Sequence, residues 1–213
     1  MFKVRFCYEK KDTAAYISHL DLIRTFQRSF LRAGLPVKYS QGFNPHIEMS
    51  IVVPLSTGYD SVCELCDLEL TEDSLPEDFA LRLNAQLPAG MRVLSVRQAQ
   101  RPVGEIAYCA YEITLPEGDC AKMTALFQQP VLLEKRSKRG SRQVNLTDYI
   151  RQLFFAPENG RTLCRCVLSA GNDPLNPLYI TAALKQAGLI PEDGEAHYLR
   201  TGILDKNCCI FQQ

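Results

Sequence analysis

Two of the three histidines stand where an imidazole could take part in acid–base chemistry. His19 follows the predicted start of a helix, with Asp21 close by, and His46 ends a short loop. Imidazole titrates near neutral pH and can act as a general acid or base. His19 and His46 are therefore the catalytic candidates, and the two could approach one another above a sheet edge. Alternatively, the two imidazole rings only form hydrogen bonds with neighbouring backbone groups. No nucleophile is placed beside them by a motif, and no P-loop or dinucleotide fingerprint occurs.

The loop from Tyr39 to His46 gathers a second set of functional groups. Gly42 can adopt a positive φ and Asn44-Pro45 favours a turn, so a sharp bend between two extended segments is predicted. Rings, an amide and an imidazole on a rigid loop are typical of binding sites. Alternatively, the rings cap the core of a plain hairpin. The candidate binding residues here are Lys38, Tyr39, Gln41, Phe43, Asn44 and His46.

Basic side chains gather in two further stretches, although 24 basic residues balance 24 acidic ones over the chain. One is a helix face on which arginines recur every four residues. The other is a predicted hairpin, 135–142, that holds five bases and no acid, whereas 60–78 holds eight acids and no base. The further binding candidates are Arg24, Arg28, Lys135, Arg136, Lys138, Arg139 and Arg142, with Arg32 continuing the helix stripe. Rings beside cations favour RNA, which is held by stacking and phosphate contacts, although the RNP sequences of RNA-recognition motifs are missing.

The nine cysteines do not form a recognisable metal or cluster motif. Cys63 and Cys66 have a chelating spacing, but on a strand residues three apart point to opposite faces. Without a second pair at finger spacing, neither a metal site nor a cofactor is expected. No cysteine lies four residues before Cys63, so the C-x-x-x-C-x-x-C motif of a radical-generating iron–sulfur cluster is absent. No signal peptide or membrane-length apolar run is visible, which predicts a cytoplasmic protein with free thiols.

Periodicity predicts an α+β protein in which a first unit, residues 1–99, carries both candidate histidines and the Tyr39–His46 loop. Its helix starts with an S-x-x-D capping box at Ser18 and stops at Gly34 and Pro36. A second helix runs from about Pro76 to Leu87. The predicted strands are Lys3–Tyr8, Val37–Tyr39, Glu48–Pro54, Ser61–Leu70 and Met91–Arg97. The order is β-α-β-β-α-β, the ferredoxin-like arrangement, with an antiparallel sheet.

A second unit, residues 105–213, is predicted to repeat that order. Helices are expected after Asp119 and from Asn176 to about Ala187. Residues 144–155 are ambiguous between strand and helix and are interpreted as an insertion. The predicted strands are Ile106–Leu115, Val131–Glu134, Thr162–Ser169 and Tyr198–Leu204. Two ferredoxin-like units in tandem resemble, in topology alone, RNA-processing proteins of the CRISPR repeat-associated type.

The first half resembles the radical-SAM-linked protein family, whose members have no established function and are fused to, or encoded beside, radical SAM enzymes. The matching segments are SHLDLIRTFQRSFLRAGLPVKYSQGFNPH, PLSTG, the spaced Glu64, Asp67 and Leu70, and LNAQLPAG. In the second half, VNLTDYI and the Asn176-Pro177 helix are similar, although VNLTDYI is less basic than the family pattern. The resemblance implies an accessory domain whose radical SAM partner is a separate polypeptide. It marks as candidate site residues Ser18, His19, Asp21, Arg24, Tyr39, Gly42, Phe43, Asn44 and His46.

Three functions remain open from the sequence. The leading hypothesis is a non-catalytic accessory protein that acts with a radical SAM enzyme and presents RNA, such as tRNA, for modification. The alternative is an RNA-processing enzyme of the tandem ferredoxin-like type with His19 or His46 as general acid or base. The third is a scaffold that binds neither RNA nor a small ligand.

Overall fold

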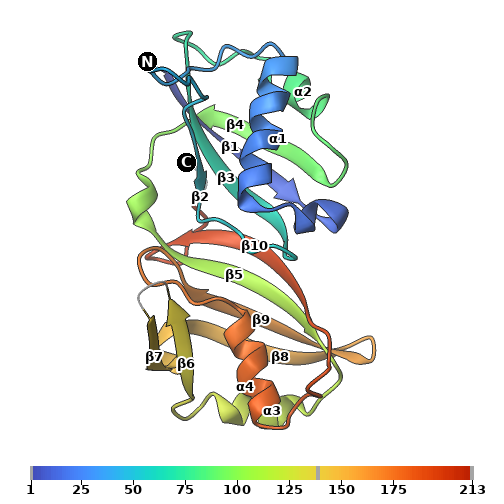
Figure 1. Ribbon diagram of the computed structural model, residues 1–213. Helices are drawn as coiled ribbons and strands as arrows, with labels where there is room; N and C mark the ends of the chain where they lie inside the picture. The colour runs from blue at the N-terminus through green and yellow to red at the C-terminus, as the bar shows by residue number, and fades with distance from the viewer. Residues whose placement is uncertain (1, 138–139, 212–213) are drawn as a thin grey trace. The chain divides into compact units, whose positions relative to one another are not determined.

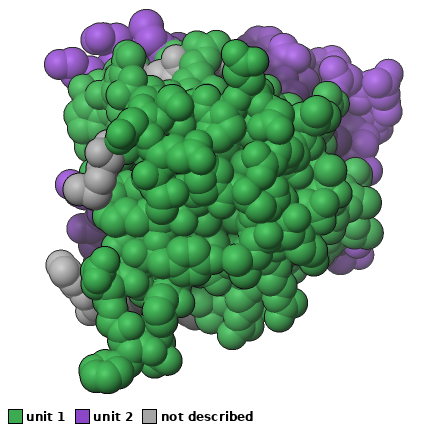
Figure 2. All heavy atoms as spheres, turned by 90° about the horizontal axis from the view of Figure 1, so that it is seen from above, with its two compact units in different colours: residues 1–105, 210–213 green, residues 106–209 purple. Residues whose placement is uncertain are grey.

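A computed structural model describes residues 2–137 and 140–211, and the chain divides into two compact units (Figures 1 and 2). The first unit is Met1–Glu105 together with Ile210–Gln213, and the second is Ile106–Cys209. The sequence placed the whole C-terminal stretch in the second unit. Phe211 belongs to the first unit because the guanidinium carbons of Arg5 and Arg101 lie 5.0 and 4.6 Å from its ring centroid.

The first unit is a four-stranded antiparallel sheet with two helices on one face (Figure 1). Its strand order is β4-β1-β3, and β2 pairs with β3. In chain order its elements are β1 (Phe2–Lys10), the 3-10 helix η1 (Asp12–Tyr16), α1 (His19–Arg32), β2 (Met49–Val52), β3 (Asp60–Leu70), α2 (Phe79–Asn84), β4 (Met91–Gln98) and the 3-10 helix η2 (Val103–Glu105). The predicted element order of this unit is present, although Val37–Tyr39 forms only two isolated bridges, to Leu70 and to Ile47.

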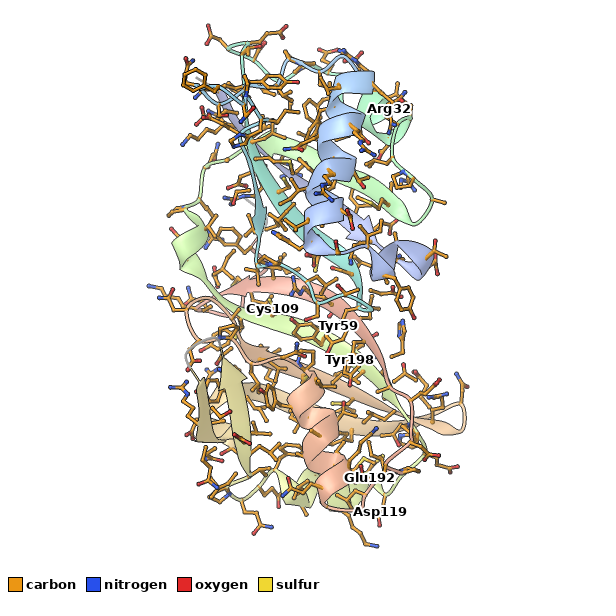
Figure 3. All side chains as sticks on the ribbon, in the orientation of Figure 1. Arg32, Tyr59, Cys109, Asp119, Glu192 and Tyr198 are labelled. Atoms are coloured by element: carbon orange, nitrogen blue, oxygen red, sulfur yellow. The ribbon has the colours of Figure 1, made fainter. Side chains whose placement is uncertain are left out.

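Helix α1 begins and ends where the sequence signals place its boundaries. The Ser18 hydroxyl accepts a hydrogen bond from the Asp21 backbone N–H at 3.2 Å, which satisfies one of the free donors of the first turn. At the other end Ala33 is the C-cap that follows Arg32, and Gly34 takes a φ of +60° that few other residues adopt without strain. Arg32 lies in this last turn (Figure 3).

Aromatic rings hold α1 against the sheet. Phe26 of α1 lies 5.2 Å from the Phe6 ring and 5.0 Å from the Tyr8 ring, both in edge-to-face contact. Phe30, one turn later, meets Phe6 at 6.1 Å and Phe79 of α2 at 6.4 Å. All five rings are fully or almost fully buried. These contacts set the position of α1 and therefore the place where the chain enters the Tyr39–His46 loop.

The second unit is also an antiparallel four-stranded sheet, in the order β10-β5-β9-β8, to which a separate two-stranded hairpin, β6–β7, is added. The Asp119 carboxylate starts α3 by accepting hydrogen bonds from the N–H groups of Ala121 and Lys122 (Figure 3). The elements are β5 (Ile106–Leu115), α3 (Cys120–Leu126), β6 (Leu132–Ser137), β7 (Gly140–Asn145), the 3-10 helix η3 (Leu146–Tyr149), β8 (Ile150–Glu158), β9 (Arg161–Ser169), α4 (Leu178–Gln186) and β10 (His197–Asp205).

The segment 144–155 is not an insertion but leads into the strand β8 of the main sheet. It contains the end of β7, the turn η3 and the first part of β8, and the added element is the β6–β7 hairpin instead. The segment is a strand because Phe155 pairs with Cys164 on β9 and its ring stacks at 6.1 Å on Phe127, the C-cap residue of α3. Those partners are distant in sequence, so the local pattern could not reveal them. Among the described residues, no helix has the length and apolar character needed to cross a bilayer.

The ring cluster around α1 makes a direct stability prediction. Phe26→Ala removes a fully buried ring and should lower the free energy of unfolding of the first unit by about 3–5 kcal/mol. Hydrogen exchange of the β1 amides measures this change. The control is Leu31→Ala on the exposed face of α1, which should change the same free energy by less than about 0.5 kcal/mol. Equal effects of the two variants would contradict the packing described above.

Candidate functional site

The Tyr39–His46 loop is closed at its base by three contacts between Ser40 and His46. The Ser40 N–H donates to the His46 carbonyl at 2.8 Å, and the His46 N–H donates to the Ser40 hydroxyl oxygen at 3.1 Å. The same hydroxyl lies 2.9 Å from His46 Nδ1. Because the hydroxyl oxygen already accepts from the backbone, its own hydrogen can be donated to Nδ1. The imidazole therefore serves to close the loop.

A ladder of charges holds the two strands that leave the loop. Lys38 Nζ lies 2.9 Å from a Glu48 carboxylate oxygen and 2.7 Å from one of Glu69 on β3, and Glu69 also pairs with Lys3 at 3.4 Å. Hydrogen bonds from Lys38 first, and from Lys3, lower the pKa of Glu69, and the carboxylates raise the pKa of Lys38. The Lys38 charge is thus balanced by these two carboxylates. Lys38, one of the predicted binding residues, is therefore already paired within the protein.

The tip of the loop presents an aromatic ring to solvent. Phe43 is fully exposed, and Gln41 and Asn44 on either side of it are exposed too. Gly42 has a φ of +139°, the positive φ that the sequence predicted for the bend. Tyr39, at the base, is about one-third exposed and bridges Ile47. The Phe43 ring does not cap the core, so the plain-hairpin alternative does not describe it.

The two candidate catalytic histidines are not brought together. The Ala15 carbonyl, just before α1, accepts a hydrogen bond from the Gly58 N–H at 2.8 Å, which places His19 near the start of β3. His46 lies beside the end of β3, because Lys38 donates its N–H to the Glu69 carbonyl at 2.9 Å. The eleven residues of β3 between these points span roughly 35 Å at about 3.3 Å per residue. His19 and His46 cannot act on one atom.

The helix arginines are partly occupied by local contacts. Arg24 donates to Asp21 at 3.0 Å, and hydrogen bonds from Ser18 and Arg24 lower the pKa of Asp21. Arg32 donates to the Gln86 carbonyl at 3.0 Å and so links α1 to the end of α2. Asp21 is therefore a capping and pairing residue and not a partner for His19. Arg28 is exposed on the same face of α1.

An open groove of about 420 Å³ lies beside the loop on the first unit. Its walls include His46, Glu48 and Glu69 from the loop base, together with Lys3, Asp67 and Ala99. The carboxylates are paired: Asp67 accepts two hydrogen bonds from Arg5, at 2.6 and 2.7 Å, and the two glutamates meet Lys38. Each of these carboxylates is therefore paired with a cation, so none of them offers a ligand an unpaired negative charge.

The basic hairpin is tied to the turn that precedes α4. Lys135 Nζ lies 2.5 Å from one oxygen of Asp173, and Arg142 lies 2.6 Å from the other. The Tyr149 hydroxyl donates to the same carboxylate at 2.7 Å, and Lys135 lies 4.5 Å from the Tyr149 ring centroid. Two cations thus share one carboxylate, which leaves the cluster with a net positive charge. Arg136 lies on β6 without a described side chain, and Lys138 and Arg139 lie outside the described residues.

The cysteines take no part in the loop, groove and hairpin contacts described above. Cys66 is buried on β3, and desolvation raises the pKa of its thiol. Cys164 and Cys166 share one face of β9, as predicted, and both are buried. Within residues 2–137 and 140–211, no three side chains of His, Cys, Asp or Glu are grouped so that they could hold a metal ion.

Several residues of the site were not foreseen from the sequence. Ser40 and His46 stand three residues before and after Phe43, and Lys38 and Glu48 stand five residues before and after it, as cross-loop partners would; this symmetry was the available signal. Asp173 had no such signal, because it lies 31 residues from Arg142. Long-range ion pairs of this kind leave no local pattern.

Comparison with known proteins places the chain in a family. The profile of a family described as uncharacterised proteins conserved in bacteria, DUF2344, matches residues 3–177. The chain belongs to this family. The match covers both the Tyr39–His46 loop and the basic hairpin, so both are parts of the DUF2344 region. No curated protein matches the chain. A crystal structure of an unknown protein from Galdieria sulphuraria is similar to the chain at 14% identity, over 93% of this chain and 98% of that chain. Its TM-score of 0.30 is too low to indicate a shared fold.

Removing the central cation of the charge ladder should loosen the loop. In Lys38→Ala, Glu48 and Glu69 lose their shared partner and repel one another. Exchange of the Glu48 and Ser40 amide hydrogens should therefore accelerate by about three- to tenfold. Amide hydrogen exchange measures this effect. Lys3→Ala, which removes the exposed end of the ladder, is the control and should leave both rates nearly unchanged.

The hairpin cluster predicts a pH dependence. Hydrogen bonds from Lys135 and then Tyr149 lower the pKa of Asp173 from 3.8 to about 2. Because the folded-state pKa is depressed, the stabilisation is complete above about pH 4 and is lost as the pH falls towards about 2. The protection of the β6–β7 amides against exchange, relative to the intrinsic rate at each pH, should fall over that range, and Asp173→Asn should show the low protection already at pH 7. Glu134→Gln removes the same charge from the β6–β7 hairpin itself but leaves Asp173 in place, so it should not reduce the protection of these amides at pH 7.

Proposed function

We propose that this protein is a non-catalytic accessory protein that binds RNA, such as a tRNA, and presents it to a separate radical SAM enzyme. The observation that carries the proposal is the Phe43 ring, fully exposed at the tip of a loop that is closed by hydrogen bonds. A fully exposed phenylalanine on a positioned loop gains free energy when it stacks on a base. The radical SAM partner is inferred from the sequence resemblance and from the absence of the cluster motif in this chain.

The fold we propose for both units is ferredoxin-like. Two features support it. First, each unit has two strand–helix–strand halves. Second, the strands lie side by side in the order β4-β1-β3-β2 in the first unit and β10-β5-β9-β8 in the second, which in both units is the fourth, first, third and second strand of the main sheet. In that order each helix crosses over a strand that lies between its two flanking strands. Such a sheet leaves the face opposite its helices available to a ligand.

The RNA-processing alternative finds no support in the site geometry. It needs His19 or His46 as a general acid or base near bound RNA. His46 Nδ1 already meets Ser40, and the roughly 35 Å of β3 between the two histidines excludes a pair. The compensated groove beside His46 also lacks a free carboxylate that could serve as the second catalytic group.

The test of RNA binding is fluorescence anisotropy of a labelled tRNA titrated with the full chain. Phe43→Ala should raise the Kd roughly 5- to 150-fold, as expected for the loss of about 1–3 kcal/mol of base stacking. Tyr16→Ala, which removes another exposed ring of the first unit, is the matched control and should leave the Kd unchanged. An unchanged Kd for Phe43→Ala, or the absence of binding at low salt, would refute RNA presentation by this loop. The accessory role is tested separately by co-purification of a radical SAM protein encoded beside this chain.

A further inference from the structure

The second unit has a sheet face that its helices do not cover. Tyr198 on β10 meets Thr181 of α4 through hydroxyl groups 2.8 Å apart, and Phe155 on β8 stacks on Phe127, the C-cap residue of α3. Side chains alternate between the two faces along a strand. The neighbours of Tyr198 and Phe155 in sequence, Leu199 and Phe154, therefore lie on the face opposite α3 and α4.

Strand register places four residues in one row across that opposite face. Phe154 pairs with Arg165, Arg165 with Glu112, and Glu112 with Leu199. The Phe154 side chain is 59% exposed. An aromatic ring and a guanidinium group thus stand on directly opposite residues of adjacent strands, about 5 Å apart at their Cβ atoms.

Arg165 is held in place by one contact and keeps most of its donors. Its Nε donates to Glu112 at 2.9 Å, while the side chain remains 60% exposed. Its two terminal nitrogens have no hydrogen bond to any described residue. A guanidinium that is oriented through Nε presents four N–H donors in a fork that suits a phosphate group.

The rows on either side of this row hold shorter or buried side chains. The row on one side of it contains Ala156, Leu163, Thr114 and His197, and the row on the other side contains Gln152, Val167, Ala110 and Gly202. Leu163 and Val167, the neighbours of Arg165 on β9, are buried, whereas Phe154 and Arg165 are both more than half exposed. An exposed ring beside one oriented cation fits a nucleotide of a single strand.

We propose that this helix-free face of the second unit binds single-stranded RNA, with one base stacked on Phe154 and a neighbouring phosphate on Arg165. The inference rests on the proposed RNA-binding function and adds a second contact surface to the Phe43 loop. The charge complementarity between the oriented guanidinium and a phosphate selects RNA over an apolar peptide as the occupant.

The experiment uses the full chain and a fluorescein-labelled oligouridylate of twelve nucleotides, followed by anisotropy at several salt concentrations. Phe154→Leu, which keeps an apolar side chain but no ring, should weaken binding by roughly 5- to 50-fold. Arg165→Gln should weaken binding and reduce the slope of log Kd against log salt by about 0.7, the value for one lost phosphate contact to a single strand. Leu178→Ala, an exposed apolar residue on α4, is the matched control and should bind as the unaltered protein does.

The outcomes separate this inference from the proposed function. Binding that is weakened by Phe43→Ala but not by Phe154→Leu or Arg165→Gln overturns the second surface and leaves the loop in place. Absence of oligouridylate and tRNA binding by the unaltered protein overturns both. Equal weakening by Phe154→Leu and Leu178→Ala would mean nonspecific loss and would also overturn the inference. Circular dichroism of each variant confirms that the chain has folded.

Discussion

The edge-to-face packing of Phe26 and Phe30 on Phe6 is the constraint on which the first unit depends. It holds α1 in register with β1, and a helix of fourteen residues is about 21 Å long. The chain must therefore leave the helix near the C-terminal end of β3. There the positive φ of Gly34 reverses the chain, and Val37 bridges Leu70. The position of the Phe43 loop is thus a consequence of core packing.

Charge compensation decides which of the candidate residues can meet a ligand. Lys38, Lys135, Arg142 and Arg165 each lie within 2.9 Å of a carboxylate, so each is already paired within the protein. A polyanion would have to compete with those carboxylates. Arg165 differs in that only its Nε meets the carboxylate, which leaves its outer donors open. The RNA recognition proposed for this protein therefore relies on exposed rings and on oriented donors more than on a broad basic surface, in keeping with a net charge of zero.

Elements whose signals are local were predictable. The Ser18 cap, the Gly34 stop, the strand Ile106–Leu115 and the cap at Asp119 all appear where the sequence places them. The segment 144–155 was not resolved, because its alternation suits a strand and a helix about equally. Only its pairing with β9 and the Phe127–Phe155 stack decide in favour of the strand.

By itself, the sequence determined the α+β class, the element order of the first unit, the bent loop at Gly42 and the absence of a cluster motif, since each depends on residues close together in the chain. Tertiary structure alone decided that Lys38 is neutralised by Glu69, that Asp173 holds the basic hairpin and that His19 and His46 lie apart. It also decided that Phe154 and Arg165 share an open sheet face. These relations join residues 11 to 38 positions apart in the chain, and strand register and packing, which no local pattern encodes, bring them together or separate them.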